Sequence, residues 1–363
     1  MKKNRKIVIK VGTKVLTSKD RGLDKLRVRD IASQVSDIRK KGIDVLIVTS
    51  GAIGSGMWLL GMKKRPLELA SLQAAAAIGQ NYLMQLYSEY FKEYGYLTAQ
   101  ILLTQEDFND RKRYLNIKHT IDAILKHNVV PIINENDTVA TDEIRCGDND
   151  RLSSLVADIA GCDTLIMLTD VDGLLDENGS VINTVTDVSQ KVMRLAGKSH
   201  CDLGTGGMAT KLASARAASK AGIDCIIANG RAKNILYRIV VDGEGVGTKI
   251  ICDKKSHDAK KRWIAYSSKA KGSICVDDGA RSALCHGNKS LLASGIVGID
   301  GDFASGDVIV ISDRQGSEFA RGVSNYSAID VNKIKGLKSR DFKGILGCKA
   351  KDEVVHKNNL VIL

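Results

Sequence analysis

The chain has 363 residues, which exceeds the usual size of one domain and favours two domains or one large domain with an appendage. Apolar residues make up 44% and charged residues 26%, as in ordinary globular proteins, so a disordered or fibrous chain is excluded. No apolar run reaches the roughly 18 to 20 residues of a membrane-spanning helix, and the charged start lacks a signal-peptide pattern. We therefore expect a cytoplasmic protein without membrane contact.

The formal net charge of +12 raises the question of nucleic-acid binding. Residues 271–363 hold 13 Lys and Arg against 11 Asp and Glu, so nearly all of the excess belongs to the first 270 residues. The densest basic run lies around Lys260, Lys261 and Arg262. We interpret it as a solvated connector, which is the simpler alternative to an RNA-binding patch.

Cysteine and histidine give no sign of a metal site. The eight cysteines lack a CxxC pair, which is typical of reduced thiols, and the six histidines show no metal-ligand spacing. We expect no structural metal, so catalysis has to come from other residues.

Short apolar runs alternate with helical patterns through the first 250 residues. The runs predict buried strands at 7–11, 44–50, 129–134, 164–170 and 225–229. Between two of them, the spacing of Leu152, Leu155, Val156 and Ile159 predicts a helix with one apolar face. This alternation predicts an α/β fold with a mostly parallel sheet sandwiched between helices, and ligands bound beyond the carboxyl ends of the strands.

After about residue 270 the helical periodicity fades, and short segments separated by Gly, Asp and Asn turn signals appear. This pattern predicts a small β-barrel-like module. We expect one domain at 1–255 and another at 272–363, joined by a basic connector at 256–271.

Two glycine-containing motifs follow the first two predicted strands. KVGT places Lys10 at a strand end before Gly12, which is a candidate phosphate site, although an edge lysine and a turn glycine would explain the motif alone. TSGAIGSG, at 49–56, leads into a helix whose amide groups could meet an acidic ligand. Neither motif fits the dinucleotide fingerprint or a P-loop.

A denser polar cluster spans INENDTVAT, which starts at Ile133, and CGDNDRLSSL at 146–155. Asn134 and Asn136 can donate to carboxylate oxygens. Acceptors for an ammonium group, hydrated Mg²⁺ or lysines are Asp137, Asp148, Asn149 and Asp150. Capping of the following helix could account for Asp148 or Asp150, but not for the whole cluster.

GTGGMATK, at 204–211, opens a helix with Lys211 in its first turn, where a cation opposes the helix dipole. That position costs about 0.3 to 1 kcal/mol unless an anion such as phosphate lies against it. The motif therefore suggests a functional site, with a solvent-facing surface lysine as the alternative.

KVGT, TSGAI, INENDTVAT, GDND, TDVDGL and GTGGMATK, in this order and spacing, resemble the amino-acid kinase family and most specifically its glutamate 5-kinase members. The likeness covers nearly all of residues 5–252, including SLQAAAAIGQ at 71–80. In the tail, VDDGARSAL, NKSLLASGI and ARGVSNY resemble the PUA module appended to many of these kinases.

The resemblance implies transfer of the ATP γ-phosphoryl group, with Mg²⁺, to the side-chain carboxylate of L-glutamate. The product would be L-glutamyl 5-phosphate, in the first step of proline biosynthesis. That carboxylate is ionised at pH 7, so no general base is required and catalysis reduces to positioning and charge neutralisation. The resemblance also implies proline as a feedback inhibitor that competes with glutamate, and a homo-oligomer.

The resemblance assigns roles to individual residues. Lys10 and Lys211 would stabilise the transferring group, with Lys10 also contacting ATP, and Asp150 would hold both lysines in place. The amino acid would be bound by Ser50, Asp137, Asp148 and Asn149. ATP would be bound by Thr169, Asp170, Thr205, Gly206, Gly207, Met208, Ala209, Thr210 and Lys211. No direct Mg²⁺ ligand can be named. Nucleobase contacts are the least defined, because Leu175 replaces a common aromatic residue.

Two alternatives stay open. Another amino-acid kinase could act on acetylglutamate, aspartate or a nucleoside monophosphate, although INENDTVAT, GDND and the tail argue against this. From a different class, the chain could be an RNA-binding module on a kinase scaffold, since PUA domains elsewhere recognise structured RNA. The nearly balanced charge of the tail does not favour RNA.

Overall fold

The computed structural model describes residues 5–18, 22–139, 148–197, 207–252, 261, 263–267, 270–287, 289–347 and 351–363. The chain divides into two compact units, residues 1–256 and 257–363. Each unit has its own hydrophobic core.

In the described part of the chain, the first unit is built on an eight-stranded sheet in the order β3-β4-β2-β1-β5-β7-β8-β6. Neighbouring strands pair in parallel except β7 with β8, so the predicted mostly parallel sheet is confirmed. The strands are β1 (Lys6–Val11), β2 (Asp44–Thr49), β3 (Thr98–Leu103), β4 (Val130–Glu135), β5 (Thr164–Thr169), β6 (Thr184–Val185), β7 (Asp224–Asn229) and β8 (Thr248–Ile250).

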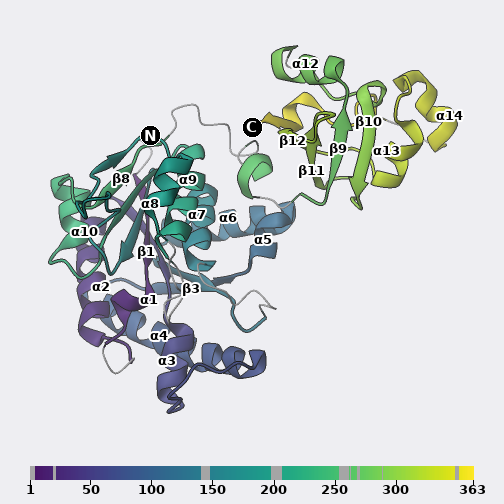
Figure 1. Cartoon of the computed structure of the whole chain (residues 1–363). Helices are drawn as coiled ribbons and strands as arrows, with labels where there is room; N and C mark the ends of the chain where they lie inside the picture. The colour runs from purple at the N-terminus through teal and green to yellow at the C-terminus, as the bar shows by residue number, and fades with distance from the viewer. Residues whose placement is uncertain are drawn as a thin grey trace. The chain divides into compact units, whose positions relative to one another are not determined.

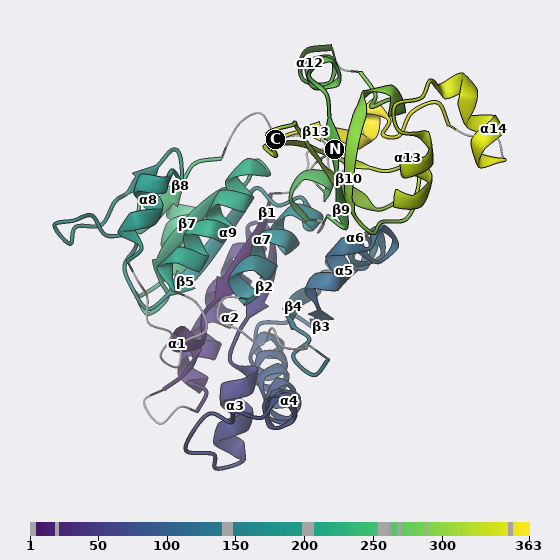
Figure 2. The same cartoon turned by 45° about the vertical axis from the view of Figure 1, so that its right-hand side comes forward.

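Helices cover both faces of this sheet (Figure 1 and Figure 2). α2 and α4 pack on one face, and α6, α7 and α9 pack on the other. The helices are α1 (Thr13–Leu16), α2 (Lys25–Lys40), α3 (Ala52–Leu59), α4 (Leu69–Glu93), α5 (Gln105–Asn109), α6 (Arg111–Lys126), α7 (Asp148–Ala160), α8 (Gln190–Leu195), α9 (Met208–Lys220) and α10 (Ile235–Tyr237). Among the described helices, none is both long and apolar enough to cross a bilayer.

Strand β1 distributes its side chains between the two helical layers. Ile7, Ile9 and Val11 belong to the core that β1 forms with α2 and α4. Lys10 is out of phase with them, because successive side chains of a strand point to opposite faces, and it meets α7 instead. Strand periodicity thus directs one lysine away from the apolar layer and towards the other face.

The five strands predicted from apolar runs are present, each within one residue of its predicted ends. The helix predicted from Leu152 to Ile159 is α7, and its four apolar side chains are buried. Strand β3 was not predicted. It lies at an edge of the sheet and most of its side chains are only partly buried, so it lacks the continuous apolar run of a central strand.

Helices α3 and α4 cross with their backbones in contact. A Cβ atom on Gly56 would lie 1.7 Å from the carbonyl oxygen of Ala75, and one on Gly79 would lie 1.8 Å from that of Ala52. Only glycine allows two helices to approach this closely. Gln80, the residue after Gly79, accepts a hydrogen bond from Asn134 Nδ2 of β4 at 2.8 Å.

In its described residues, the second unit contains a mixed five-stranded sheet in the order β10-β9-β11-β12-β13. Its strands are β9 (Gly272–Val276), β10 (Ile296–Gly301), β11 (Val308–Ser312), β12 (Glu318–Val323) and β13 (Leu360–Ile362). The predicted strand-rich module is confirmed. Helical structure was underestimated, because this unit also contains α12 (Asp278–Gly287), α13 (Ala328–Ile334) and α14 (Phe342–Leu346). α13 and α14 are short, at seven and five residues, so their periodicity is weak.

We predict that Gly56→Ala destabilises the chain by about 1 to 3 kcal/mol, because the added methyl group forces α3 and α4 apart. The free energy of unfolding in urea measures this effect. Gly54→Ala is the matched control, since a Cβ at Gly54 has no atom within 4 Å in the described part of the chain. The control should be neutral or slightly stabilising, because alanine favours helices. Equal losses in both variants would contradict the close crossing.

Candidate active site

The candidate site lies at the carboxyl edge of the sheet, where β1, β2, β4 and β5 end. β1 is paired with β2 on one side and with β5 on the other. The chain therefore adds strands on one side of β1 first and on its other side later. Open parallel sheets bind their ligands at such a switch point. Helices α7 and α9 pack against each other, and residues from the first turn of each approach the end of β1.

One carboxylate joins two lysines at this edge. Asp150 Oδ1 lies 2.5 Å from Lys10 Nζ, and Asp150 Oδ2 lies 3.3 Å from Lys211 Nζ. Asp150 is fully buried, while Lys10 and Lys211 are 4% and 5% exposed. The three residues come from α7, β1 and α9, and the cluster carries one net positive charge when all three are ionised.

The electrostatics of the cluster follow from one carboxylate serving two ammonium groups. Burial alone raises the pKa of Asp150, but Lys10, Lys211 and a hydrogen bond from Thr210 outweigh it and lower the pKa below its usual value. Burial lowers the pKa of Lys211; Asp150 opposes this change, and Lys10 adds to it, so the net shift is downward. Asp150 is therefore ionised, and Lys211 is the group in this cluster whose charged form is disfavoured by its surroundings.

Two alternatives raised by the sequence do not hold for Lys211 and Asp150, while the capping alternative for Asp148 concerns a side chain outside the described residues. Lys211 does not face solvent, although it lies in the first turn of α9, because it is buried against Asp150. Helix capping does not account for Asp150, since its carboxylate is held by Lys10, Lys211 and the hydroxyl of Thr210, at 2.9 Å.

Beside this charged cluster, four neutral side chains form a hydrogen-bonded chain. Asn149 Nδ2 donates to Ser50 Oγ at 3.1 Å and to Asn134 Oδ1 at 3.0 Å. Asn134 Nδ2 donates to Gln80 Oε1 at 2.8 Å. We call Ser50, Asn149, Asn134 and Gln80 the amide chain. Its members come from the loop after β2, from α7, from β4 and from α4.

Two members of the amide chain were not among the predicted site residues. Asn134 was noted only as an amide that could bind a carboxylate, and Gln80 was not singled out. The signal at Gln80 is a polar side chain directly after Gly79 in an alanine-rich helix, where small residues indicate close packing. Periodicity alone does not reveal that Gln80 meets a strand end.

The predicted ATP residues lie at the ends of β5 and the start of α9. Thr169 is 5% exposed, and its hydroxyl donates to Asp170 Oδ1 at 3.2 Å. Asp170 also pairs with Lys14 at 3.0 Å. Burial raises the pKa of Asp170, and the hydrogen bond from Lys14 contributes most to a net lowering. Lys14 is a further cation near this edge that the sequence did not identify.

The remaining predicted residues are placed as follows. Gly207 precedes α9, and Met208, Ala209 and Thr210 form its first turn with Lys211. Asp137 is half-buried in the turn after β4. The side chain of Asp148 and the residues Thr205 and Gly206 lie outside the described residues.

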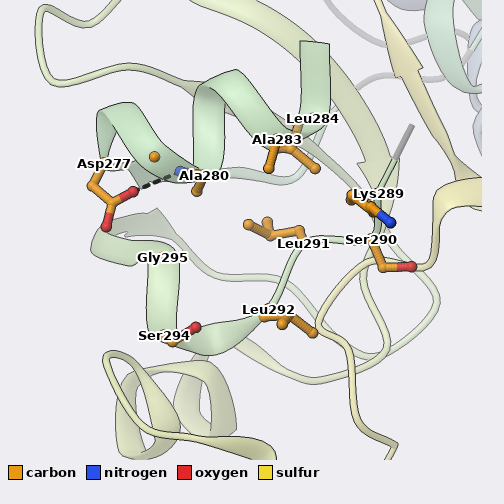
Figure 3. A pocket seen from close by; sticks show the side chains of 11 residues that line it. Asp277, Ala280, Ala283, Leu284, Lys289, Ser290, Leu291, Leu292, Ser294 and Gly295 are labelled. Atoms are coloured by element: carbon orange, nitrogen blue, oxygen red, sulfur yellow. Dashed lines mark hydrogen bonds between the residues drawn. The ribbon is translucent and has the colours of Figure 1, made fainter. Parts of the chain in front are cut away.

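The second unit has a cavity of about 480 Å³ between α12 and the segment that precedes β10 (Figure 3). Leucine side chains line its middle, with Asp277 and Lys289 at opposite ends. Asp277 accepts a hydrogen bond from the backbone nitrogen of Ala280 at 2.7 Å, which caps α12. The charged groups of this cavity do not converge as those of the first unit do.

Two buried lysines thus lie at the carboxyl edge of a mostly parallel sheet, an arrangement that suits phosphate groups, and the sequence contains no P-loop motif. The chain belongs to the amino acid kinase family, whose model matches residues 5–229. A PUA domain matches residues 272–346.

The chain is similar along its whole length to curated proteins named glutamate 5-kinase. It is 46% identical to the one from Caldanaerobacter subterraneus subsp. tengcongensis, over 99% of this chain and 98% of that protein. It is 44% identical to those from Thermoanaerobacter sp. and Moorella thermoacetica, over 99% of this chain and 98% and 96% of theirs.

We predict that Asp150→Asn destabilises the chain by about 3 to 5 kcal/mol, because two buried ammonium groups lose their shared counter-charge. Urea unfolding at neutral pH measures the loss. The difference in stability between the variant and the wild type should shrink as pH falls below about 3.9. In that range the unfolded wild type binds a proton at Asp150 while the folded state does not, so the wild type loses the stability that the carboxylate provides.

The matched control for this variant is Asp37→Asn, which removes an exposed carboxylate paired with Lys40. Because solvent screens such a pair, its loss should leave the free energy of unfolding nearly unchanged. A similar effect of both substitutions would contradict the role assigned to Asp150.

Proposed function

We propose that this chain transfers the γ-phosphoryl group of ATP to the side-chain carboxylate of L-glutamate, producing L-glutamyl 5-phosphate for proline biosynthesis. The observation that carries the proposal is the buried Lys10–Asp150–Lys211 cluster beside the amide chain. Two cations there suit a transferring phosphate, and neutral amides suit an amino acid. The full-length similarity to glutamate 5-kinases supports glutamate over the other acceptors.

The reaction brings together two anions, the substrate carboxylate and the nucleotide phosphate, so their repulsion has to be reduced. Lys10 and Lys211 are buried, and charges act more strongly where water is excluded. The carboxylate nucleophile is already ionised and needs no base. Asp150 then acts as a positioning residue that keeps both ammonium groups charged and oriented.

Mg²⁺ enters this reaction as part of the nucleotide substrate. Within the described ranges, no group of three or more His, Cys, Asp or Glu side chains is arranged to hold a metal ion. In the proposed reaction the phosphates of ATP supply the principal ligands, and the ion neutralises charge that develops on them.

We assign the remaining predicted residues to the two substrates. Ser50, Asn149, Asp137 and Asp148 would bind glutamate, and the ATP site would comprise Thr169, Asp170 and residues 205–211. Amides at the start of α9 suit phosphate oxygens, because helix N-termini attract anions.

We further propose a cytoplasmic homo-oligomer in which residues 1–255 catalyse and residues 272–363 form an accessory domain after a connector at 256–271. Light scattering coupled to size-exclusion chromatography tests the oligomer, and a monomer would contradict it. RNA is not part of this proposal, since the charge of residues 271–363 is nearly balanced.

We propose that proline inhibits by competing with glutamate, because it shares the α-carboxylate and a cationic nitrogen. Raising glutamate should then relieve the inhibition completely. Initial rates over a grid of both concentrations measure this, and a proline-dependent fall in the maximal rate would contradict competition.

The central experiment measures glutamate-dependent acyl phosphate formation with Mg-ATP, trapped as the hydroxamate. Wild type should form hydroxamate, and Lys211→Ala should lower kcat by about 10²- to 10³-fold, as expected when one preorganised charge-stabilising group is lost. The same loss is expected for Lys10→Ala.

Lys220→Ala is the matched control, because Lys220 is exposed at the other end of α9. It should retain wild-type turnover. No hydroxamate from the wild type would contradict the proposed reaction, and full activity of Lys211→Ala would contradict the assigned site.

A further inference from the structure

The orientation of every amide in the amide chain follows from one backbone group. The nitrogen of Glu135 donates to Asn134 Oδ1 at 2.9 Å. A backbone N–H can only donate, so the atom it meets on Asn134 has to be the oxygen. The other end of Asn134 is then an NH₂ group, which requires an acceptor.

The orientation of Asn134 fixes the orientation of its two neighbours in the amide chain. The atom of Gln80 that receives Asn134 Nδ2 has to be Oε1, so the other end of Gln80 is its NH₂ group. The atom of Asn149 that meets Asn134 Oδ1 has to be Nδ2, so its other end is the oxygen. Both hydrogens of Asn149 Nδ2 are used, because it also donates to Ser50.

The chain therefore ends in one donor and one acceptor. Gln80 Nε2 and Asn149 Oδ1 are buried, and neither has a hydrogen-bond partner within the described part of the chain. Gln80 as a whole is 8% exposed, so water does not readily replace the missing partner. Buried polar groups left in this state favour a ligand that satisfies them.

An α-amino acid offers the complementary pair. Its carboxylate accepts hydrogen bonds, and its ammonium group donates them. A substrate with an acetylated amine lacks the positive charge and most of the hydrogen-bond donors that Asn149 Oδ1 could accept from. A substrate without an α-carboxylate lacks the hydrogen-bond acceptor for Gln80 Nε2. The charged cluster at Lys10 and Lys211 is suited to the reacting end of the substrate, so the amide chain is left for the other end.

We propose that Gln80 Nε2 donates to the α-carboxylate of the amino-acid substrate while Asn149 Oδ1 accepts from its α-ammonium group. This inference rests on the proposed function, which requires an amino acid at this edge of the sheet. It makes Gln80, on α4, a determinant of specificity for the unreactive end of glutamate.

Gln80→Glu tests the inference because it keeps the oxygen that accepts from Asn134 but replaces the free NH₂ group with a second oxygen. That oxygen repels an α-carboxylate and accepts from an α-carboxamide. At pH 8.5, the dissociation constant for L-glutamate should rise about 10- to 100-fold, the range expected when one hydrogen bond to a charged group is lost. Calorimetry in the presence of a non-hydrolysable ATP analogue measures it.

The swap in preference is a sharper measurement. L-Glutamic acid 1-amide, which carries a carboxamide in place of the α-carboxylate, should gain relative to glutamate in Gln80→Glu by at least about 10-fold in dissociation constant. Gln85→Glu is the matched control, with the same charge change at an exposed position of α4. It should preserve the wild-type preference.

The possible results distinguish a failure of the assigned role of Gln80 from a failure of the proposed reaction. The inference would be overturned if the Gln80→Glu variant bound glutamate as tightly as the wild type does. It would also be overturned if the variant kept the wild-type preference for glutamate over the 1-amide. A purely structural Gln80 predicts that result, because the bond to Asn134 survives. Wild type that binds glutamate but forms no hydroxamate would contradict the proposed reaction and leave the binding measurements decisive for Gln80.

Discussion

The carboxylate of Asp150 holds two buried ammonium groups in place, and most of the candidate site depends on this arrangement. Lys10 and Lys211 lie far apart in the sequence, and burying a charge without a partner is costly, so both depend on the carboxylate between them. Asp150 also ties α7 to α9 and to the central strand β1. The charged cluster therefore forms only when the sheet and both helices are in place.

The carboxyl edge of the sheet carries two neighbouring groups of side chains, one charged and one neutral. The charged cluster holds two lysines and one aspartate, and the amide chain contains no ionisable side chain. Neutral amides have directional hydrogen bonds and do not compete for the phosphate, so they can orient one end of a substrate without disturbing the other. Helix α7 serves both parts, since Asn149 belongs to the amide chain and Asp150 to the cluster.

Much of this arrangement could be predicted because its residues stand in compact motifs at strand ends. Lys10, Asp150 and Lys211 were predicted from KVGT, GDND and GTGGMATK, and the structure brings all three together. Gln80 was not predicted, because its role depends on a long-range contact between α4 and β4 that local spacing does not encode. Edge strand β3 lacks a strong apolar pattern because it is only partly buried, and α13 and α14 are too short to show clear periodicity.

The glycine crossing of α3 and α4 has a consequence for the geometry of the amide chain. Ser50 lies just before α3, and Gln80 follows Gly79 on α4, so the crossing joins the elements next to these two members of the amide chain. Because these helices touch through main-chain atoms, no side-chain rotamer change can widen or narrow their separation. The position of Gln80 on α4 relative to Ser50 is then a property of backbone packing, set by two glycines rather than by side chains.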